Sequence, residues 1–312
     1  MTIAVLPGVY REMVEPHLPD WIEAHFWEDG EELKALAPEA EIGWFDMFDK
    51  TDALVALDRA EKLKWLNSQF AGVDWMPLDL LAKRGVQLTN GSGLNANAVA
   101  EFAVMTMLAE ARGYADLIRS HDRKQWAAWP TAMRELKGSR ALIMGYGEIG
   151  SAIGRILEGL QLEVTPMRRS ARDGALGPDE WRGRLGDFDY VILAMPGTPE
   201  TAGMIGAAEL AAMKSEAVLV NYARADIIDQ RALADALHAG KLGGAILDLT
   251  DPEPLPEDHF LWDCPNIRIT MHKAGLPTPQ IREGTAQRFL DNCQAWKDGA
   301  PLTAEVDLSL GY

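Results

Sequence analysis

Cysteine is scarce in this chain, since only Cys264 and Cys293 occur among its 312 residues. Two cysteines cannot form a disulfide framework or supply a cysteine-rich zinc site. The six histidines include no pair with the spacing of metal ligands. We therefore predict a protein without a resident metal, whose two cysteines are buried packing residues.

Basic residues are outnumbered and long apolar runs are missing. The 30 lysines and arginines face 47 aspartates and glutamates, which gives a net charge of −17. A chain this acidic is repelled by phosphate backbones and by anionic membrane surfaces. The longest apolar stretch, residues 98–108, is shorter than the ~20 residues that span a bilayer, and Met1–Pro7 lacks the basic start of a signal peptide. We thus expect a soluble, cytoplasmic protein with no nucleic-acid or membrane partner.

The composition that is present is typical of a globular enzyme with two domains. The chain is 47% hydrophobic and 25% charged, and its length exceeds what one hydrophobic core serves. Short aliphatic runs alternate with longer amphipathic ones, which is the pattern of β-α-β units and a parallel sheet. The predicted strands are residues 3–6, 41–45, 63–67, 86–89, 140–144, 162–167, 190–194, 217–221, 245–249 and 267–270.

A helix predicted over residues 96–112 separates four of these strands from the other six. It divides the chain into an N-terminal α/β domain and a larger central one. This helix is more apolar than one domain face requires, which indicates a subunit contact. A last helix, residues 279–298, has no strand of its own to cover and is expected to pack against the first domain.

A glycine-rich loop follows the predicted strand 140–144 and opens a helix predicted over residues 151–160. In that context a G-x-G-x-x-G sequence predicts a dinucleotide site, because the helix N-terminus faces the pyrophosphate with free N–H groups. The first glycine permits the tight turn, the second lets the backbone approach the pyrophosphate, and the third allows close contact between helix and strand. The loop consists of Gly145, Tyr146, Gly147, Glu148, Ile149 and Gly150.

The next strand ends without the acidic residue that usually binds the ribose hydroxyls of NAD. Arg168, Arg169 and Ser170 stand there instead. Two guanidinium groups and a hydroxyl suit a 2′-phosphate, whereas a carboxylate would repel it. We therefore favour NADP(H) as the cofactor, with NAD(H) as the alternative if the two arginines are only solvated.

Three later segments place reactive side chains just beyond predicted strands. Arg224 follows the strand 217–221, Glu253 lies in the loop after 245–249, and His272 follows 267–270. Ligands of open α/β sheets bind at the carboxyl ends of the strands. Arginine, acid and histidine are therefore expected to meet in one site suited to reducing a carbonyl beside a carboxylate.

These segments resemble motifs of the D-isomer-specific 2-hydroxyacid dehydrogenases. Residues 221–229 are similar to N-x-A-R-G-x-x-[IV]-D, residues 247–255 to L-D-V-F-x-x-E-P-L, and residues 270–275 to T-P-H-x-[AG]-G. Upstream, residues 68–74 are similar to S-x-x-A-G-V-D, residues 90–102 to N-x-x-G-x-N-A-x-A-V-A-E-F, and residues 196–201 to P-x-T-P-E-T. The resemblance covers nearly the whole chain and is greatest to the glyoxylate/hydroxypyruvate reductase branch.

The resemblance implies two Rossmann-like domains, each an α/β doubly wound parallel sheet, with the active site in the cleft between them. It implies a substrate-binding domain of residues 1–93 and 276–312, and a dinucleotide-binding domain of residues 94–275. It also implies that the protein is a homodimer through the helix predicted over residues 96–112.

Individual roles follow from the resemblance. His272 is expected to protonate the carbonyl oxygen, Glu253 to pair with His272 and favour the imidazolium, and Arg224 to bind the carboxylate of the 2-oxo acid. The backbone N–H groups of Gly72 and Val73 complete the carboxylate site, and Trp44 with Phe45 limits the substrate's R group. The predicted substrate-binding set also includes Ala71, and the cofactor-binding set adds Pro196, Thr201, Ala223 and Asp248.

The chain departs from these motifs beside the predicted catalytic histidine. Met271 replaces a proline, and Lys273, which is either a solvated charge or a source of positive potential, replaces an apolar residue or glycine. We predict NADPH-dependent reduction of a small 2-oxo acid such as glyoxylate or hydroxypyruvate. The alternatives are a dehydrogenase for a bulkier D-2-hydroxy acid, formate oxidation, against which Glu253 argues, and a non-catalytic dinucleotide sensor of the corepressor type.

Overall fold

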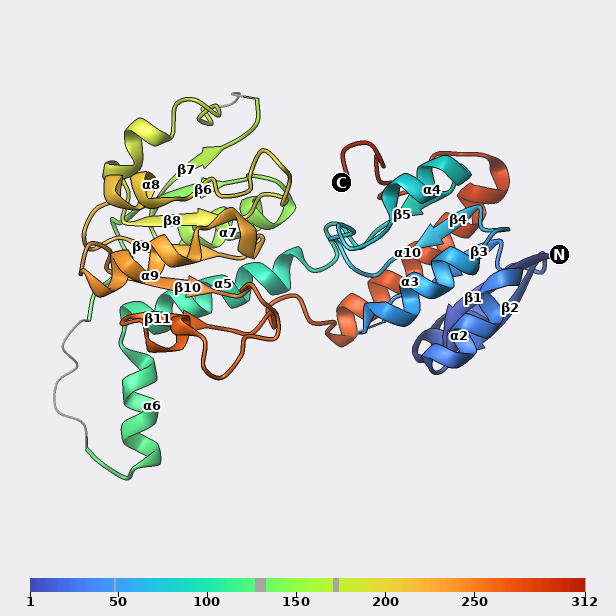
Figure 1. Ribbon diagram of the computed structural model, residues 1–312, viewed down its shortest axis with the longest axis horizontal. Helices are drawn as coiled ribbons and strands as arrows, with labels where there is room; N and C mark the ends of the chain where they lie inside the picture. The colour runs from blue at the N-terminus through green and yellow to red at the C-terminus, as the bar shows by residue number, and fades with distance from the viewer. Residues whose placement is uncertain (48, 127–132, 171–173, 312) are drawn as a thin grey trace. The chain divides into compact units, whose positions relative to one another are not determined.

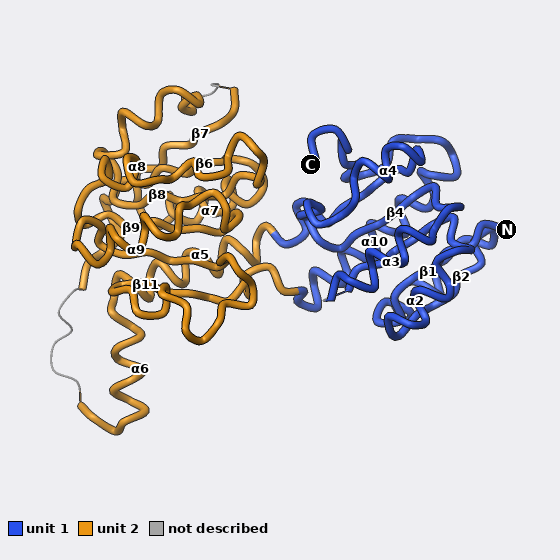
Figure 2. Tube along the Cα trace, viewed as in Figure 1, with its two compact units in different colours: residues 1–95, 277–312 blue, residues 96–276 orange. Residues whose placement is uncertain are grey.

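The chain forms two compact units, shown in Figure 2. A computed structural model describes residues 1–47, 49–126, 133–170 and 174–311. Unit 1 consists of Met1–Asn95 and Pro277–Tyr312, and unit 2 of Ala96–Leu276. None of the described helices is both long enough and apolar enough to cross a membrane.

Unit 1 is built on a five-stranded parallel sheet with the order β2-β1-β3-β4-β5. Alternate residues of β1 enter two separate cores: Val5 packs with one helical layer, and Ala4 and Leu6 pack with another. The strands are β1 (Thr2–Pro7), β2 (Ile22–Trp27), β3 (Ile42–Trp44), β4 (Trp65–Asn67) and β5 (Gln87–Thr89). The helices are α1 (Arg11–Val14), α2 (Gly30–Leu36), α3 (Lys50–Arg59), α4 (Leu78–Arg84) and α10 (Pro279–Asp298).

Strand β2 was not among the predicted strands, so the expectation of four strands in this unit was wrong. Its sequence, Ile-Glu-Ala-His-Phe-Trp, has neither an apolar run nor a clean alternation. The strand lies at the edge of the sheet, paired only with β1, and most of its side chains are partly exposed. An edge strand is half solvated, so its composition carries little of the signal that marks a buried strand.

Unit 2 contains a six-stranded parallel sheet with the order β11-β10-β9-β8-β6-β7 (Figure 1). Helices α5 and α7 share one core with this sheet, and α8 and α9 share the other. The strands are β6 (Arg140–Met144), β7 (Glu163–Met167), β8 (Tyr190–Leu193), β9 (Val218–Asn221), β10 (Gly244–Leu247) and β11 (Ile267–Ile269). The helices are α5 (Ala96–Ala111), α6 (Tyr114–Asp122), α7 (Glu148–Gly159), α8 (Ala207–Ala212) and α9 (Gln230–His238).

The strand order of unit 2 reverses between β6 and β8, which are neighbours although β7 lies between them in the sequence. Such a reversal opens a crevice at the carboxyl ends of the strands, where doubly wound sheets bind ligands. Strand β7 tolerates Pro166 because it lies at the edge of the sheet. The N–H that proline lacks is therefore not needed for a hydrogen bond to a further strand. The fold is therefore α/β with two parallel sheets, as the sequence predicted.

Candidate active site

The glycine-rich loop joins β6 to α7 at this reversal. Gly145 has φ = 90°, and a Cβ there would lie 2.5 Å from the backbone nitrogen of Met195. A Cβ on Gly150 would lie 2.0 Å from the carbonyl oxygen of Gly145, whereas a Cβ on Gly147 would meet nothing within 4 Å. The first and third glycines are thus required by the fold, and the second faces open space beside the N-terminus of α7. This arrangement fits a dinucleotide pyrophosphate.

The loop after β8 lies on the other side of the point where the strand order reverses. The hydroxyl of Thr201 donates to the carbonyl oxygen of Pro196 at 3.0 Å and accepts the backbone N–H of Thr198 at 2.8 Å. These bonds stabilise residues 196–201 as a compact turn, which follows directly after Met195, the residue beside Gly145. The predicted cofactor residues of two separate segments therefore lie at one edge of the sheet.

The residues predicted to select the cofactor follow β7. Arg168 is partly buried, and its guanidinium carbon lies 5.2 Å from the centroid of the Tyr146 ring. Arg169 and Ser170 are exposed. The structure thus brings Arg168 onto the glycine-rich loop, a contact that the sequence did not indicate.

Strands β9, β10 and β11 are adjacent and in register, with Asn221, Leu247 and Ile269 as partners. The segments that follow these residues lie at the same edge of the sheet. Buried Asn221 shapes the first segment, since its amide donates to the carbonyl oxygen of Arg224 and accepts the N–H of Ala223. The Arg224 guanidinium in turn donates to the carbonyl oxygen of Ala223 at 2.8 Å.

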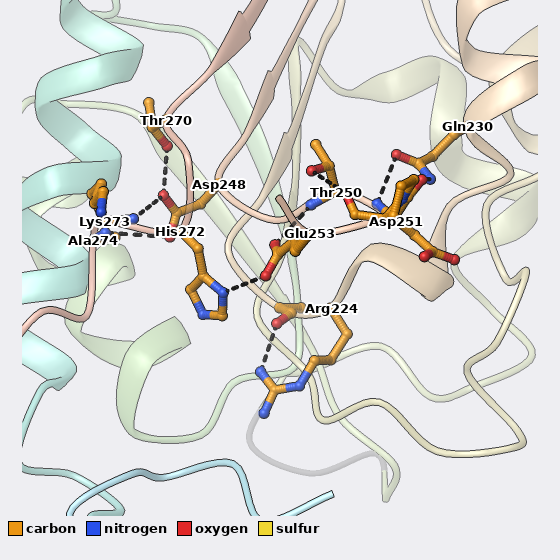
Figure 3. Close-up of polar contacts among 12 residues, drawn as sticks. Arg224, Gln230, Asp248, Thr250, Asp251, Glu253, Thr270, His272, Lys273 and Ala274 are labelled. Carbon is orange, nitrogen blue, oxygen red and sulfur yellow. Dashed lines mark hydrogen bonds and ion pairs between the residues drawn. The ribbon is translucent and has the colours of Figure 1, made fainter. Parts of the chain in front are cut away.

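The imidazole of His272 pairs with a carboxylate (Figure 3). Its Nδ1 atom lies 2.9 Å from Oε2 of Glu253, whose Oε1 accepts the backbone N–H of Thr250 at 3.0 Å. Because a carboxylate only accepts, Nδ1 carries the hydrogen of this bond. The Nε2 atom, on the other side of the ring, is then available to exchange a proton with a bound molecule.

Asp248 holds the turn that carries this histidine. Its Oδ1 accepts the Thr270 hydroxyl at 2.6 Å and the Lys273 N–H at 3.0 Å, and its Oδ2 accepts the Ala274 N–H at 3.3 Å. Its carbonyl oxygen accepts the His272 N–H. The family resemblance predicts that Asp248 contributes to the cofactor site, and these four contacts also give its buried side chain and carbonyl a positioning role. Only the fold could show this, because the partners lie more than 20 residues away.

The turn itself adopts an uncommon backbone conformation. Met271 and His272 have φ values of 57° and 54°, in the left-handed region. Proline, which the family motif has at this position, fixes φ near −65° and could not adopt this turn. The replacement by Met271 is therefore consistent with the local structure.

In unit 1, the predicted substrate loop of residues 71–73 is stabilised from two sides. Asp46 accepts the Ser68 hydroxyl at 2.8 Å and the Gln69 N–H at 2.5 Å. From the other side, Asn90 donates to the carbonyl oxygen of Ala71 at 2.8 Å. No pattern in the sequence singles out Asp46, which stands between Phe45 and Met47. Ala71 and Gly72 are partly exposed, and Val73 is buried.

Burial raises the pKa of Asp46 to about 6, partly offset by its hydrogen bonds from the Gln69 N–H, the Ser68 hydroxyl and the Trp44 indole. Among the described residues, no positively charged group contributes to the pKa shift of this carboxylate. Its charge is therefore stabilised only by neutral donors, which partly compensate for the lost hydration.

Trp44 and Phe45 are buried in unit 1. Trp44 is fully buried, its ring lying 4.3 Å from that of Tyr10 and 5.3 Å from that of Phe289 (centroid distances). Phe45 is 2% exposed and belongs to the opposite core. That these two residues limit the substrate's R group stays a prediction. An aromatic pair at a strand end gives no signal in the sequence of which way its rings turn.

No group of three or more His, Cys, Asp or Glu side chains in the described part of the chain is arranged to hold a metal ion. At the carboxyl ends of β9, β10 and β11, His272 and Glu253 form an imidazole–carboxylate pair. The chemistry available there is proton exchange by an imidazole and binding of an anion by a guanidinium.

Comparison with known proteins gives a consistent result. Residues 104–274 match the model of the D-isomer specific 2-hydroxyacid dehydrogenase NAD binding domain. The chain is 31% identical to a glyoxylate reductase of Korarchaeum cryptofilum over 314 residues, covering 93% of this chain and 92% of the relative. It is 33% identical to a D-lactate dehydrogenase of Treponema pallidum over 267 residues, covering 79% and 80%.

Solved structures show the same similarity. A D-isomer specific 2-hydroxyacid dehydrogenase family protein of Aeromonas salmonicida superposes with a TM-score of 0.89 at 28% identity, covering 98% of this chain and 99% of that one. An NADPH-dependent glyoxylate/hydroxypyruvate reductase of Sinorhizobium meliloti, in complex with NADP and malonate, superposes with a TM-score of 0.81 at 25% identity, covering 99% and 98%.

Proposed function

The chain belongs to the D-isomer-specific 2-hydroxyacid dehydrogenases, NAD(P)-dependent enzymes that interconvert 2-oxo and 2-hydroxy acids, and on this premise we propose that it reduces a small 2-oxo acid of the glyoxylate or hydroxypyruvate type with NADPH. The observation that carries the reaction is the pairing of His272 with Glu253 at the sheet edge that also bears Arg224. The glyoxylate reductases among its relatives support the substrate class.

In this proposal His272 is the general acid. Its Nδ1 hydrogen is held by Glu253, so Nε2 gives its proton to the carbonyl oxygen as the new C–H bond forms at the carbonyl carbon. The Glu253 carboxylate stabilises the imidazolium that must exist before transfer. The bound reduced nicotinamide supplies the hydride. In the reverse direction the neutral imidazole takes the hydroxyl proton.

Arg224 binds the carboxylate of the substrate. A guanidinium makes paired, charge-assisted hydrogen bonds to a planar carboxylate, which fixes both position and orientation. Its backbone carbonyl is held by Asn221, so the side chain projects from a rigid turn. The family resemblance implies that the backbone N–H groups of Gly72 and Val73 also take part in binding the substrate, and we keep that assignment as part of the proposal.

The preference for NADPH rests on the residues after β7. Arg168, Arg169 and Ser170 replace the carboxylate that would bind ribose hydroxyls and repel a 2′-phosphate. The solved reductase of Sinorhizobium meliloti is described as NADPH-dependent. NADH remains the alternative cofactor.

We also propose a homodimer formed through α5 and α6. Helix α6 has no buried residue and projects away from the sheet of unit 2 (Figure 1). Tyr114, Leu117 and Ile118 on this helix, and Met105 and Leu108 on α5, expose between 38% and 54% of their surface. Large exposed apolar side chains on two consecutive helices are typical of a subunit interface.

The test of the reaction is to measure initial rates with glyoxylate and hydroxypyruvate, using NADPH and NADH in parallel. Faster oxidation of NADPH with either acid is the expected result. No turnover with both acids and both cofactors, in a protein that binds the cofactor, would overturn the substrate assignment. A bulkier 2-oxo acid such as phenylpyruvate, assayed in the same way, is the alternative to examine.

A further inference from the structure

The ring of Tyr146 lies between helix α7 and Arg168. Its hydroxyl oxygen occupies the position beside Gly154, where an added Cβ would lie 2.4 Å away from it and 2.9 Å from the ring carbon Cε2. The guanidinium carbon of Arg168 lies 5.2 Å from the ring centroid. A single aromatic side chain of the glycine-rich loop thus contacts both the helix that follows the loop and the arginine that follows the next strand.

The presence of glycine at position 154 independently supports this placement of the Tyr146 ring. Glycine in the middle of a helix costs stability relative to alanine, by roughly 0.5–1 kcal/mol. Gly154 is buried in α7, and its φ is not among the positive values that would call for glycine. The space that its missing side chain leaves is filled by Tyr146. The helix therefore accommodates the ring at a cost to its own stability.

Arg168 depends on this ring for its orientation. Its backbone is held by the N–H bond to the carbonyl oxygen of Leu176 at 3.0 Å. Its long side chain has many rotamers, and ordering such a side chain costs up to about 2 kcal/mol. A cation over an aromatic face is attracted by the ring, which limits those rotamers before any ligand binds.

We propose that Tyr146 is a positioning residue for cofactor selection, whose ring holds the Arg168 guanidinium where it meets the 2′-phosphate of NADP(H). This inference rests on the proposed preference for NADPH. The ring remains uncharged in this role, because burial and the nearby Glu158 raise the pKa of the phenol, while Arg155 and Arg168 oppose them. The ring itself has no donor for the phosphate other than its hydroxyl, which is turned toward Gly154.

The experiment uses ligand fragments, so that binding is read without turnover. Affinities for 2′,5′-ADP and for 5′-AMP are measured by calorimetry on the full-length protein and its variants. Tyr146→Ala is expected to weaken 2′,5′-ADP binding by about two- to fivefold, the range of an exposed cation–π contact, and to leave 5′-AMP binding unchanged. Tyr146→Phe, which keeps the ring, is expected to retain the affinity for both.

Two further variants distinguish a role of Tyr146 in positioning Arg168 from general damage to the glycine-rich loop. Arg168→Ala is expected to remove most of the discrimination, and adding Tyr146→Ala to it is expected to have no further effect. Gly154→Ala, which displaces the ring, is expected to lower discrimination when Tyr146 is present and not when alanine replaces it.

The outcomes distinguish this inference from the function on which it rests. If the unmodified protein does not discriminate between the two fragments, the proposed NADPH preference is wrong. If it discriminates and Arg168→Ala leaves that discrimination intact, Arg168 does not recognise the 2′-phosphate and the inference is overturned while the preference stands. If Arg168→Ala removes discrimination and Tyr146→Ala does not lower it, only the role of Tyr146 is wrong. Equal weakening of both fragments by Tyr146→Ala would mean that the ring supports the phosphate loop as a whole, which also overturns the inference.

Discussion

The Nδ1 atom of His272 lies 2.9 Å from the Oε2 atom of Glu253, although the two side chains are 54% and 37% exposed. An ion pair this exposed contributes little to the stability of a fold, typically 0–1 kcal/mol. Its alignment is therefore better explained by the proton chemistry of the imidazole. The backbone bond from Thr250 to the other carboxylate oxygen fixes Glu253 in the orientation that this pairing requires.

Replacing His272, the proposed general acid, tests the mechanism directly. His272→Ala is expected to lower kcat by the 10²–10⁴-fold typical of a lost general acid, while the affinity for 2′,5′-ADP stays unchanged. Glu253→Gln keeps the ring and loses only the charge beside it, so a smaller fall is expected. Steady-state rates with glyoxylate and NADPH measure both. Near-normal turnover of His272→Ala would remove this residue from the reaction.

The cofactor preference is tested by reversing the charge after β7. Arg168→Asp combined with Arg169→Ala is expected to raise the KM for NADPH by about 10- to 100-fold, since hydrogen bonds to charged groups contribute roughly 1.5–3 kcal/mol each. The KM for NADH should change little, because its ribose carries hydroxyls there. Equal losses for both cofactors would show that these arginines do not recognise the 2′-phosphate.

The turn formed by Met271 and His272 can be tested with proline, the residue of the family motif at position 271, which is expected to be destabilising here. Met271→Pro fixes φ near −65° where the chain has 57°, so both the stability and kcat are expected to fall. Met271→Asn, which tolerates the left-handed region, is the matched control and should keep both. Urea unfolding and steady-state rates provide the two readings. Full activity in the proline variant would mean that the turn does not need this conformation.

The buried carboxylate of Asp46 predicts a dependence of stability on pH. The pKa of Asp46 in the folded protein is raised from 3.8 to about 6, so between these values the folded state binds more protons than the unfolded one. The free energy of unfolding therefore falls as pH rises through this range, by about 3 kcal/mol in total. It reaches its lower limit above the folded pKa.

Asp46→Asn isolates this contribution, because the other titrating groups are shared by the two proteins. Urea unfolding at several pH values between 4 and 8 should show the advantage of the unmodified protein over the variant shrinking as pH rises. A difference independent of pH would contradict the raised pKa. Steady-state rates of the same two proteins at these pH values give the KM for glyoxylate. That KM reports whether Asp46 also holds the substrate loop.

The proposed homodimer is tested on the projecting helix. Leu117→Asp with Ile118→Asp places two charges on a face that would be buried between subunits, and a buried unpaired charge is strongly unfavourable. Sedimentation is expected to change from dimer to monomer while the circular dichroism spectrum is retained. Arg119→Asp, an exposed change on the same helix, is the control and should remain dimeric. A monomeric unmodified protein would contradict the proposal.

The sequence by itself determined the parallel sheets, the glycine-rich loop and the order of the reactive segments. These are local properties: aliphatic runs such as Arg140–Met144 form buried strands wherever they pair, and in parallel sheets the residues that follow the strands share one edge. The spacing of Gly145, Gly147 and Gly150 between a strand and a helix is likewise a local pattern that the sequence displays.

Only the tertiary structure decided which side chains fill the interior and which partners fix the site. Strand β2 was missed because an edge strand is half solvated. The burial of Trp44 could not be read from the sequence, because a large aromatic at a strand end suits a core as well as a pocket. The contacts of Asp248 with the His272 turn and of Tyr146 with Arg168 join residues about 20 or more positions apart. Such pairs depend on strand order and packing, which no local pattern encodes.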